Sequence, residues 1–300
     1  MKILYITGAN SNLFANTCML YDSFKLHCPK DTLWVCDFGL DSEHNEFFKS
    51  LGILLPTPSN LQSYNHPWYF KASICDFIKD MQYDAVVWLD ADMIVLEPIT
   101  DRVKGLVVEM KISNTQVSIC ADDVTLDIKK YIKFVRKQGH SVVSFEKNCL
   151  KHKTDMGRQY LNTGFFVISS LNLLSDWRDL VLSEDVDFLF EQNSFNVIAN
   201  QKQRNIKILS SHEWNAHGAR LKDVLTLRSK EMTRILHATS TGDGHAEGDF
   251  NLPINDQQLS GHIKLFKRAD LYQRQYVHLT HFAKTHFTTL AKCNLLSKVK

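Results

Sequence analysis

The sequence lacks the features that would place it outside the ordinary globular proteins. No apolar run reaches the about 18 residues that a membrane-spanning helix needs, and the first residues lack the apolar segment of a secretion signal. The seven cysteines are odd in number and no two have CxxC spacing, which argues against a disulfide framework and a zinc knuckle. We therefore expect a reducing, cytoplasmic setting.

The chain also has little net charge. Lys+Arg total 35 and Asp+Glu total 33, which leaves +2 at pH 7 and argues against a nucleic-acid partner. The charge is unevenly distributed, because residues 261–300 contain eight basic residues and one acidic residue, a net charge of +7. The remaining residues 1–260 therefore carry −5. A basic tail of this kind is typical of contact with anionic phospholipid, although it also fits a solvated helix face.

The hydrophobic fraction of 44% and the charged fraction of 23% exclude a disordered or collagen-like chain. Short apolar runs typical of buried strands alternate with helical patterns. Strands are predicted over residues 3–6, 32–36, 85–89 and 162–168, and helices over 15–27, 42–51 (with Ser42 as N-cap), 67–81 and 184–199. This alternation indicates βαβ units, and therefore an α/β fold with a mostly parallel, Rossmann-like sheet flanked by helices.

Two segments depart from this alternation. Residues 123–156 are polar and weakly patterned, which predicts either an excursion over the active site or a small helical insert. From residue 265 onward, apolar residues recur at roughly helical spacing among the bases. We predict a catalytic domain over residues 1–255 and a basic helical tail over residues 256–300, with the ligand site in the N-terminal half of the domain and the acceptor side in its C-terminal half.

Two aspartates, Asp90 and Asp92, directly follow the predicted strand at residues 85–89. Ligands of open α/β sheets bind beyond the carboxyl ends of the strands. Two carboxylates one residue apart suit a hard divalent cation, which takes oxygen ligands. The alternative is a pair of solvated aspartates at a strand end. Because apolar segments flank the pair on both sides, burial without a cation would be costly, and this favours the metal site.

Six short motifs follow one another along residues 36–215. They are Cys36-Asp37-Phe38-Gly39-Leu40, Trp68-Tyr69-Phe70-Lys71, Asp90-Ala91-Asp92, Asn162-Thr163-Gly164-Phe165-Phe166, Glu191-Gln192-Asn193-Ser194-Phe195-Asn196 and Trp214-Asn215. In this order they resemble the DxGL, aromatic-and-lysine, DxD, N-[AS]-G, DQDxLN and WN motifs of the retaining glycosyltransferases of family 8. That group has a GT-A fold and includes glycogenins and bacterial lipopolysaccharide galactosyl- and glucosyltransferases. The resemblance covers about residues 1–245.

The resemblance implies a metal-bound sugar nucleotide. A Mn²⁺ or Mg²⁺ ion would bridge Asp90, Asp92 and the diphosphate of a UDP-sugar, and would neutralise the charge that develops on this leaving group. His237 stands where the family has a third metal ligand, although a core histidine is the alternative. The residues that the resemblance places at the sugar nucleotide are Thr7, Ala9, Asn10, Asp37, Lys71, Asp90, Ala91, Asp92, Asn162 and Gly242.

The resemblance also implies a catalytic role for Gln192, with Glu191 beside it. Gln192 would orient and stabilise an oxocarbenium-like state, whereas the plain alternative is a turn at a helix start. Other implied ligand contacts have structural alternatives too: Asp37 as a cap, and Lys71 as the ion-pair partner of Asp76.

One departure from the family concerns the phosphates. The family follows its histidine with a glycine and then a Lys-Pro-Trp that holds phosphate, whereas residues 239–245 here contain no lysine. Neutralisation of the diphosphate would then depend on Lys71, Arg158 or backbone N–H groups near Gly242.

The sequence thus predicts a metal-dependent enzyme that transfers a hexose from a UDP-sugar to a saccharide or lipid-linked saccharide acceptor with retention, in the synthesis of a cell-surface glycan such as lipopolysaccharide or capsule. An inverting transferase, with Glu213, Asp243 or Glu247 as base, is one alternative. A haloacid-dehalogenase-like phosphatase and a non-catalytic sugar-nucleotide binder are alternatives of other classes.

Overall fold

The computed structural model describes residues 1–122, 126–184, 186–217, 233–238 and 245–299. The chain divides into two compact units. The first unit comprises Met1–Ile3, Pro58–Trp88 and Asp101–Ser211, and the second comprises Leu4–Thr57, Leu89–Thr100 and His212–Lys300. None of the helices in the described residues is long and apolar enough to cross a membrane.

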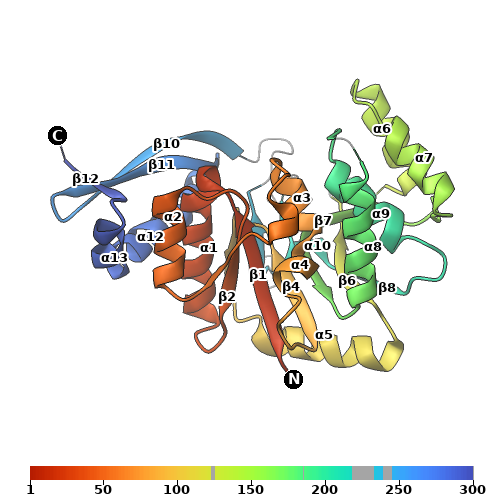
Figure 1. Ribbon diagram of the computed structural model, residues 1–300, viewed down its shortest axis with the longest axis horizontal. Helices are drawn as coiled ribbons and strands as arrows, with labels where there is room; N and C mark the ends of the chain where they lie inside the picture. Colours follow the sequence, from red (N-terminus) through yellow and green to blue (C-terminus); the bar gives the residue numbers. More distant parts are fainter. Residues whose placement is uncertain (123–125, 185, 218–232, 239–244, 300) are drawn as a thin grey trace. The chain divides into compact units, whose positions relative to one another are not determined.

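The main sheet has the strand order β3-β2-β1-β4-β7-β6-β8 (Figure 1). Its strands are β1 (Ile3–Ala9), β2 (Leu33–Asp37), β3 (Leu54–Leu55), β4 (Ala85–Leu89), β6 (Val117–Ala121), β7 (Leu161–Ile168) and β8 (Ile206–Leu209). The β1–β2, β2–β3 and β6–β8 pairs are parallel, and β6–β7 is antiparallel. The predicted α/β fold with a mostly parallel sheet is confirmed, and the strand predicted over residues 85–89 has those bounds.

In the second unit, helices α1 (Phe14–His27) and α2 (Ser42–Ser50) follow β1 and β2 in the chain, as the sequence pattern predicts. The prediction that Ser42 caps α2 is wrong by one residue. Asp41 is the N-cap, and its Oδ1 accepts a hydrogen bond of 3.0 Å from the backbone N–H of His44. Asp41 has the extended backbone that an N-cap requires, whereas Ser42 already lies within the helix.

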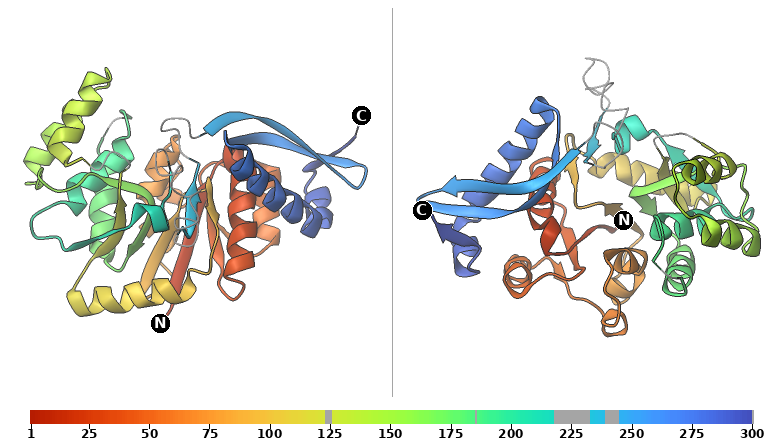
Figure 2. Two further views of the ribbon diagram at one scale, coloured as in Figure 1. Left: turned by 180° about the vertical axis from the view of Figure 1, so that it is seen from behind. Right: turned by 90° about the horizontal axis from the view of Figure 1, so that it is seen from above.

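The C-terminal segment contains strands as well as the predicted helices (Figure 2). Strands β10 (His245–Ile254) and β11 (Gln257–Phe266) form an antiparallel hairpin, to which β12 (Leu296–Lys298) adds. Helices α12 (Ala269–Thr285) and α13 (Phe287–Lys292) lie between β11 and β12 in the sequence. The hairpin spans the predicted boundary at residue 255, and the division into a domain and a tail stays a prediction.

The apolar residues of this segment belong to the core of the second unit. Leu279 and Phe282 of α12 pack in one buried cluster with Phe14 of α1, and Phe266 and Leu271 lie in another. The helical spacing of these side chains therefore reflects packing within the unit. It does not present them to a lipid surface.

The first unit carries most of the remaining helices. The helix predicted over residues 67–81 is two short helices, α3 (Pro67–Ala72) and α4 (Ile74–Phe77). Helices α6 (Ile128–Lys137) and α7 (Val143–Lys151) make residues 126–156 a small helical insert, one of the two predicted alternatives. The others are α5 (Thr100–Ser113), α8 (Leu171–Leu182) and α9 (Phe190–Ala199), with α10 (Ser211–Trp214) at the boundary of the units.

The pairing of β6 with β7 contains an irregularity. Ile119 lies opposite Phe166, but the next residue, Cys120, lies opposite Asn162. Residues 163–165 of β7 therefore have no opposite residue on β6. This irregularity lies within the predicted sugar-contact motif that begins at Asn162, and such departures from a regular ladder commonly redirect side chains at sites of function.

Candidate functional site

Two aspartates and a histidine converge in the second unit. Asp90, Ala91 and Asp92 form a turn between β4 and β5 (Met93–Val95), in which the Met93 N–H donates to the Asp90 carbonyl at 3.1 Å. Strand β5 pairs antiparallel with β9 (Ile235–His237), so that Met93 lies opposite His237. This pairing brings together residues that are about 145 positions apart in the sequence.

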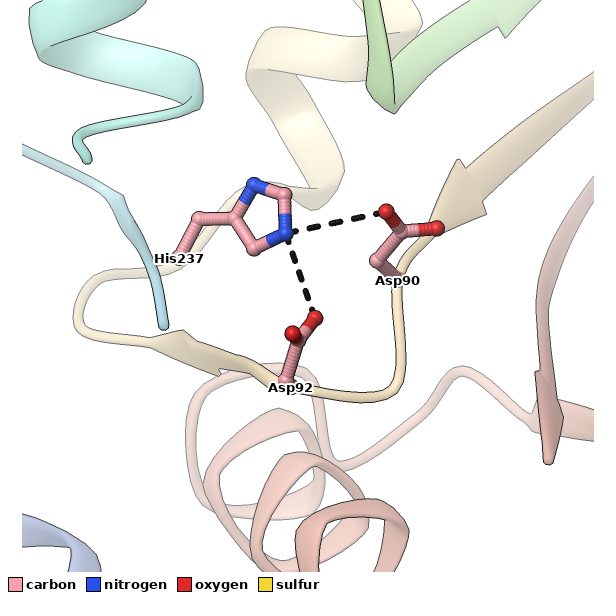
Figure 3. A group of neighbouring side chains, drawn as sticks. All are labelled: Asp90, Asp92 and His237. Carbon is pink, nitrogen blue, oxygen red and sulfur yellow. Dashed lines mark ion pairs between the residues drawn. The ribbon is translucent and has the colours of Figure 1, made fainter. Parts of the chain in front are cut away.

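The side chains of Asp90, Asp92 and His237 point toward one another (Figure 3). His237 Nε2 lies 3.2 Å from Asp92 Oδ1 and 3.6 Å from Asp90 Oδ2. One ligand atom from each residue lies within 4.8 Å of the others, and this is the one such cluster among the described residues. Asp92 and His237 are buried, whereas Asp90 is half-buried. The three predicted ligands thus lie together and form a candidate metal site, and metal binding by them stays a prediction.

A hydrogen bond to Asn215 fixes the orientation of the His237 ring. His237 Nδ1 lies 2.8 Å from Asn215 Oδ1. An amide oxygen only accepts hydrogen bonds, so Nδ1 carries a proton, and Nε2 is the ring nitrogen that faces the two carboxylates and is available to a metal. Such a partner is typical of histidines that bind metals, because it selects the tautomer and holds the ring. The donor set of two carboxylates and one imidazole fits Mn²⁺ or Mg²⁺ bound with further oxygen ligands.

Lys264 of β11 adds a positive charge to this cluster. Its Nζ lies 3.1 Å from Asp92 Oδ2. Burial would raise the pKa of Asp92, but the charges of Lys264 and His237 and hydrogen bonds with both hold it well below the ordinary value. The charge of Asp92 in turn raises the pKa of Lys264, against the effect of burial. In the sequence, Lys264 is one of the eight bases of residues 261–300, and its contact with Asp92 is not predicted.

Three predicted ligand-contact residues lie at the end of β1. Ala9 is buried, and the buried polar atoms Thr7 Oγ1 and Asn10 Oδ1 have no hydrogen-bond partner among the described residues. Gly8 lies between them, and a Cβ at this position would overlap the ring of Phe38. Thr7 and Asn10 thus retain polar atoms for a ligand, and their role as donor contacts stays a prediction.

Asp37 closes a turn at the end of β2. Its Oδ1 accepts hydrogen bonds from the backbone N–H groups of Gly39 at 2.9 Å and Leu40 at 2.8 Å, and its Oδ2 accepts one from Asn45 Nδ2 at 2.8 Å. These bonds correspond to the structural alternative given for Asp37. A sugar-nucleotide contact for this side chain stays a prediction.

Gln192 is held on α9 in the first unit by hydrogen bonds. Its Oε1 accepts from the Thr163 N–H at 3.1 Å, and its Nε2 donates to Asp122 Oδ2 and Tyr160 Oη, each at 3.2 Å. The residue before α9, Leu189, has the left-handed backbone (φ 48°) that a leucine rarely adopts. The amide of Gln192 is thus buried and fixed in orientation.

Glu191 and Lys71 form a buried ion pair in the same unit, with Lys71 Nζ 3.6 Å from Glu191 Oε1. Lys71 Nζ also lies 3.3 Å from Thr163 Oγ1 and 5.6 Å from the centre of the Trp88 ring. Asp76, the alternative partner given for Lys71, is bound instead by Arg178 at 2.7 Å.

Asn162 contacts Asp122, an acid for which no role is predicted from the sequence. Its Nδ2 donates to Asp122 Oδ2 at 3.3 Å, and its Oδ1 accepts from the Gly164 N–H at 2.9 Å. Asp122 therefore accepts hydrogen bonds from both Asn162 and Gln192. It directly follows β6, as Asp90 directly follows β4, and this position after an apolar strand is the signal that could have identified it.

The remaining predicted candidates either make contacts with other parts of the protein or belong to residues that the structure does not describe. Gly242 and Asp243 belong to residues 239–244, which the structure does not describe. Arg158 donates to the carbonyl of Arg204 at 3.0 Å and lies 3.8 Å from Asp155, which gives it a structural role. Of the alternative bases, Glu213 forms an ion pair with Arg234 at 2.7 Å, and Glu247 lies 3.8 Å from His262.

Comparison with solved structures identifies the class of fold. The chain is similar to WbbM, a bifunctional glycosyltransferase, with 11% identity and a TM-score of 0.54 over 81% of this chain and 46% of that chain. The chain is similar to GlyE of Streptococcus pneumoniae TIGR4, a glycosyltransferase, with 14% identity and a TM-score of 0.54. This match covers 100% of this chain and 65% of that chain. The chain is also similar to an active-site mutant of LgtC in which glutamate replaces glutamine. The sequence identity is 15% and the TM-score is 0.51, and the match covers 81% of this chain and 88% of that chain.

Neither a protein-family model nor a curated protein sequence matches the chain. The chain spans less than half of the WbbM chain and just under two thirds of the GlyE chain. At these identities the likeness concerns the fold. The fold is that of the GT-A glycosyltransferases, and the resemblance inferred from the sequence motifs is confirmed at this level.

Proposed function

We propose that the protein is a metal-dependent glycosyltransferase that moves a hexose from a UDP-sugar to a saccharide acceptor. The observation that carries the proposal is the convergence of Asp90, Asp92 and the Asn215-oriented His237 at one point in a glycosyltransferase fold. The neighbours named above favour sugar transfer over the phosphatase alternative. A complete set of ligands favours a catalyst over a binder that has lost its activity.

In this proposal the three ligands would hold Mn²⁺ or Mg²⁺, which would stabilise the negative charge that develops on the departing nucleoside diphosphate. Asp92 and Asp90 supply oxygen ligands, and Asn215 keeps the lone pair of His237 Nε2 directed at the same point. Thr7 and Asn10 would contact the nucleoside through their buried polar atoms. Ala9, Ala91, Asp37 and Gly242 are further predicted nucleotide contacts.

Transfer with retention is the finer part of the proposal. Gln192 would orient the sugar and stabilise positive charge near the anomeric carbon, because its amide is buried and fixed on α9. Lys71 would contact phosphate and Asn162 would contact sugar hydroxyls, with Glu191 beside Gln192. The LgtC neighbour is an active-site mutant in which a glutamine is replaced by glutamate, which supports a functional glutamine at this kind of site.

The acceptor in this proposal is a saccharide or a lipid-linked saccharide of a cell-surface glycan. The exposed bases of the C-terminal segment, such as Lys267 and Lys292, would bind anionic phospholipid if the acceptor is lipid-linked. Co-sedimentation with phosphatidylglycerol vesicles tests this extension. Binding lost on substitution of these two lysines supports it, and no binding in low salt contradicts it.

The decisive experiment is isothermal titration of UDP with and without Mn²⁺ on the wild type and on Asp92→Ala. We expect binding in Mn²⁺ that disappears with Asp92→Ala, because the ion loses a buried ligand. Asp92→Asn keeps the shape of the side chain and is the second variant, and Asp270→Asn on the exposed face of α12 is the matched control. Wild-type protein that binds no UDP in either condition contradicts the proposal.

Measured binding would justify a screen of UDP-sugars. The anomeric configuration of the product then separates retention from inversion. Inversion would turn attention to Glu213 or Glu247 as a base.

A further inference from the structure

Lys264 differs from the exposed lysines of the second unit in its burial and in its contact with a buried carboxylate. Its side chain is mostly covered, and its Nζ lies 3.1 Å from the buried Asp92 Oδ2. The other lysines near it in the sequence, Lys267 and Lys284, are exposed. Lysine loses considerable side-chain entropy when it is fixed, so such a placement needs a compensating interaction.

Two buried amide side chains hold the backbone of Lys264. Asn16 of α1 accepts a hydrogen bond of 2.9 Å from the Lys264 N–H and donates one of 3.0 Å to its carbonyl. Gln275 of α12 donates to the same carbonyl at 3.0 Å and accepts from the Phe266 N–H at 2.8 Å. Asn16 and Gln275 are each only 1% exposed. Strand β11 is thus fixed to both helices at the residue that points toward Asp92.

The two oxygens of Asp92 have separate partners. Oδ1 faces His237 Nε2, and Oδ2 faces Lys264 Nζ. An ion bound by Asp90, Asp92 and His237 can therefore use Oδ1 while Lys264 keeps its contact with Oδ2. A divalent ion and one ammonium carry +3 against −2 for the two carboxylates. The occupied cluster would then have a net charge of +1, which suits an anionic ligand.

We propose that Lys264 is a phosphate-binding residue, a fixed second cation beside the metal ligands that contacts the diphosphate of the nucleotide. The inference rests on the proposed function and deepens it, because it assigns a residue of β11 to the recognition of the donor. A lysine ammonium has three donors, so one can remain on Asp92 while others reach phosphate oxygens.

A competing explanation is that Lys264 only neutralises the buried charge of Asp92. The two explanations differ in what loss of the ammonium does. Removing a phosphate contact weakens the binding of phosphate-containing ligands even when the metal site is saturated. Removing a mere counter-charge leaves that binding unchanged, and it strengthens or leaves unchanged the binding of Mn²⁺ alone.

The test measures the affinities of Mn²⁺ alone, of uridine, and of UDP in saturating Mn²⁺ for the wild type, Lys264→Met and Lys264→Gln. We expect UDP to bind about 10- to 100-fold more weakly to both variants, because a charge-assisted hydrogen bond is lost. Uridine affinity stays equal to that of the wild type. Lys264→Arg restores most of the UDP affinity, and Lys284→Met, which removes an exposed lysine of α12, changes nothing.

Equal UDP affinity in the wild type and both Lys264 variants overturns the inference and leaves the proposed function intact. Inorganic pyrophosphate with Mg²⁺ separates the remaining cases. Pyrophosphate binding that depends on Lys264, in a protein that binds no UDP, supports the anion site and contradicts the UDP-sugar function. Wild-type protein that binds neither ligand contradicts both.

Discussion

The two groups of candidate site residues differ in the interactions that they make: one is a cluster of charged and metal-ligating groups, and the other is a hydrogen-bond network. The cluster of Asp90, Asp92 and His237 in the second unit brings two negative charges and an imidazole lone pair to one point. The group around Gln192 in the first unit is a network of amide, hydroxyl and carboxylate groups in which each of the bonds described is made within the protein. A bound cation would balance the charges of the first arrangement, whereas hydrogen bonds within the protein hold the groups of the second in place.

This difference assigns the two groups different effects on ligand binding and reaction rate. A cluster that needs a counter-charge should control the affinity for metal and for the anionic part of a ligand. A network that fixes one amide should control the rate, because preorganised dipoles act on charge that develops in the transition state. Variants that separate affinity from rate therefore test the comparison.

Gln192→Ala should have the largest effect and should act on rate alone. We expect UDP release from the preferred UDP-sugar to slow by about 100- to 1000-fold, the loss typical of a removed preorganised donor. The affinity for UDP in Mn²⁺ should stay within about twofold, since that affinity depends on the other cluster. Gln138→Ala, at the exposed C-cap of α6, is the control. A large loss of UDP affinity in Gln192→Ala would contradict the separation of roles.

Asn215→Ala should produce the opposite result. Loss of the 2.8 Å hydrogen bond frees the ring of His237, and we expect Mn²⁺ affinity to fall by about 10- to 100-fold. At saturating Mn²⁺ the rate should recover toward that of the wild type, because no transition-state contact is lost. Manganese titration followed by electron paramagnetic resonance measures the affinity, with the exposed Asn251→Ala as control. A rate that stays low at saturation would give Asn215 a different role.

Tyr160→Phe tests how much the network in the first unit depends on one of its hydroxyl groups. The hydroxyl donates to Asn193 Oδ1 at 2.8 Å and accepts from Gln192 Nε2 at 3.2 Å. Its removal leaves two buried amide groups short of a partner, so we expect a loss of about 1–3 kcal/mol in unfolding free energy. Urea denaturation measures the loss, and Tyr276→Phe on the surface should cost little. Equal stability of the two variants would show that the network tolerates a missing bond.

The sequence predicted the parts of the site that follow directly from strand ends. Asp90 and Asp92 adjoin an uninterrupted apolar run whose strand, β4, has the predicted bounds, and His237 ends another short apolar run. A buried strand is recognised in the sequence as a continuous apolar run, and the residues at the site then follow as those just after that run. The position of a strand end is therefore readable even where the pairing of strands is not.

Lys264 and Asn215 could not be predicted in the same way. Their contacts depend on how β11 and the residues before β9 are placed by distant side chains, such as Asn16 and Gln275 for β11. Register of this kind is set by tertiary contacts, and the polar, weakly patterned strand β11 carries little signal of its own. For the same reason, the sequence predicts a helical tail over residues 256–300 and does not predict the β10–β11 hairpin that contains Lys264.

The smallest expected effect concerns pH and a histidine of the second unit that belongs to neither group. Burial lowers the pKa of His286 below 6.5, against the charge of Asp22 and with a further lowering by His281. The unfolded chain therefore takes up the proton more readily, so stability is lost as pH falls from about 6.5 toward the lower pKa of the folded state.

His286→Phe keeps the ring contact with Phe282, whose centre lies 4.6 Å away, and removes the titrating group. The difference in unfolding free energy between pH 7.5 and pH 5.5 should then be smaller than in the wild type. An undiminished difference in His286→Phe would mean that the acid sensitivity arises elsewhere, and the metal ligands would then be the groups to titrate next.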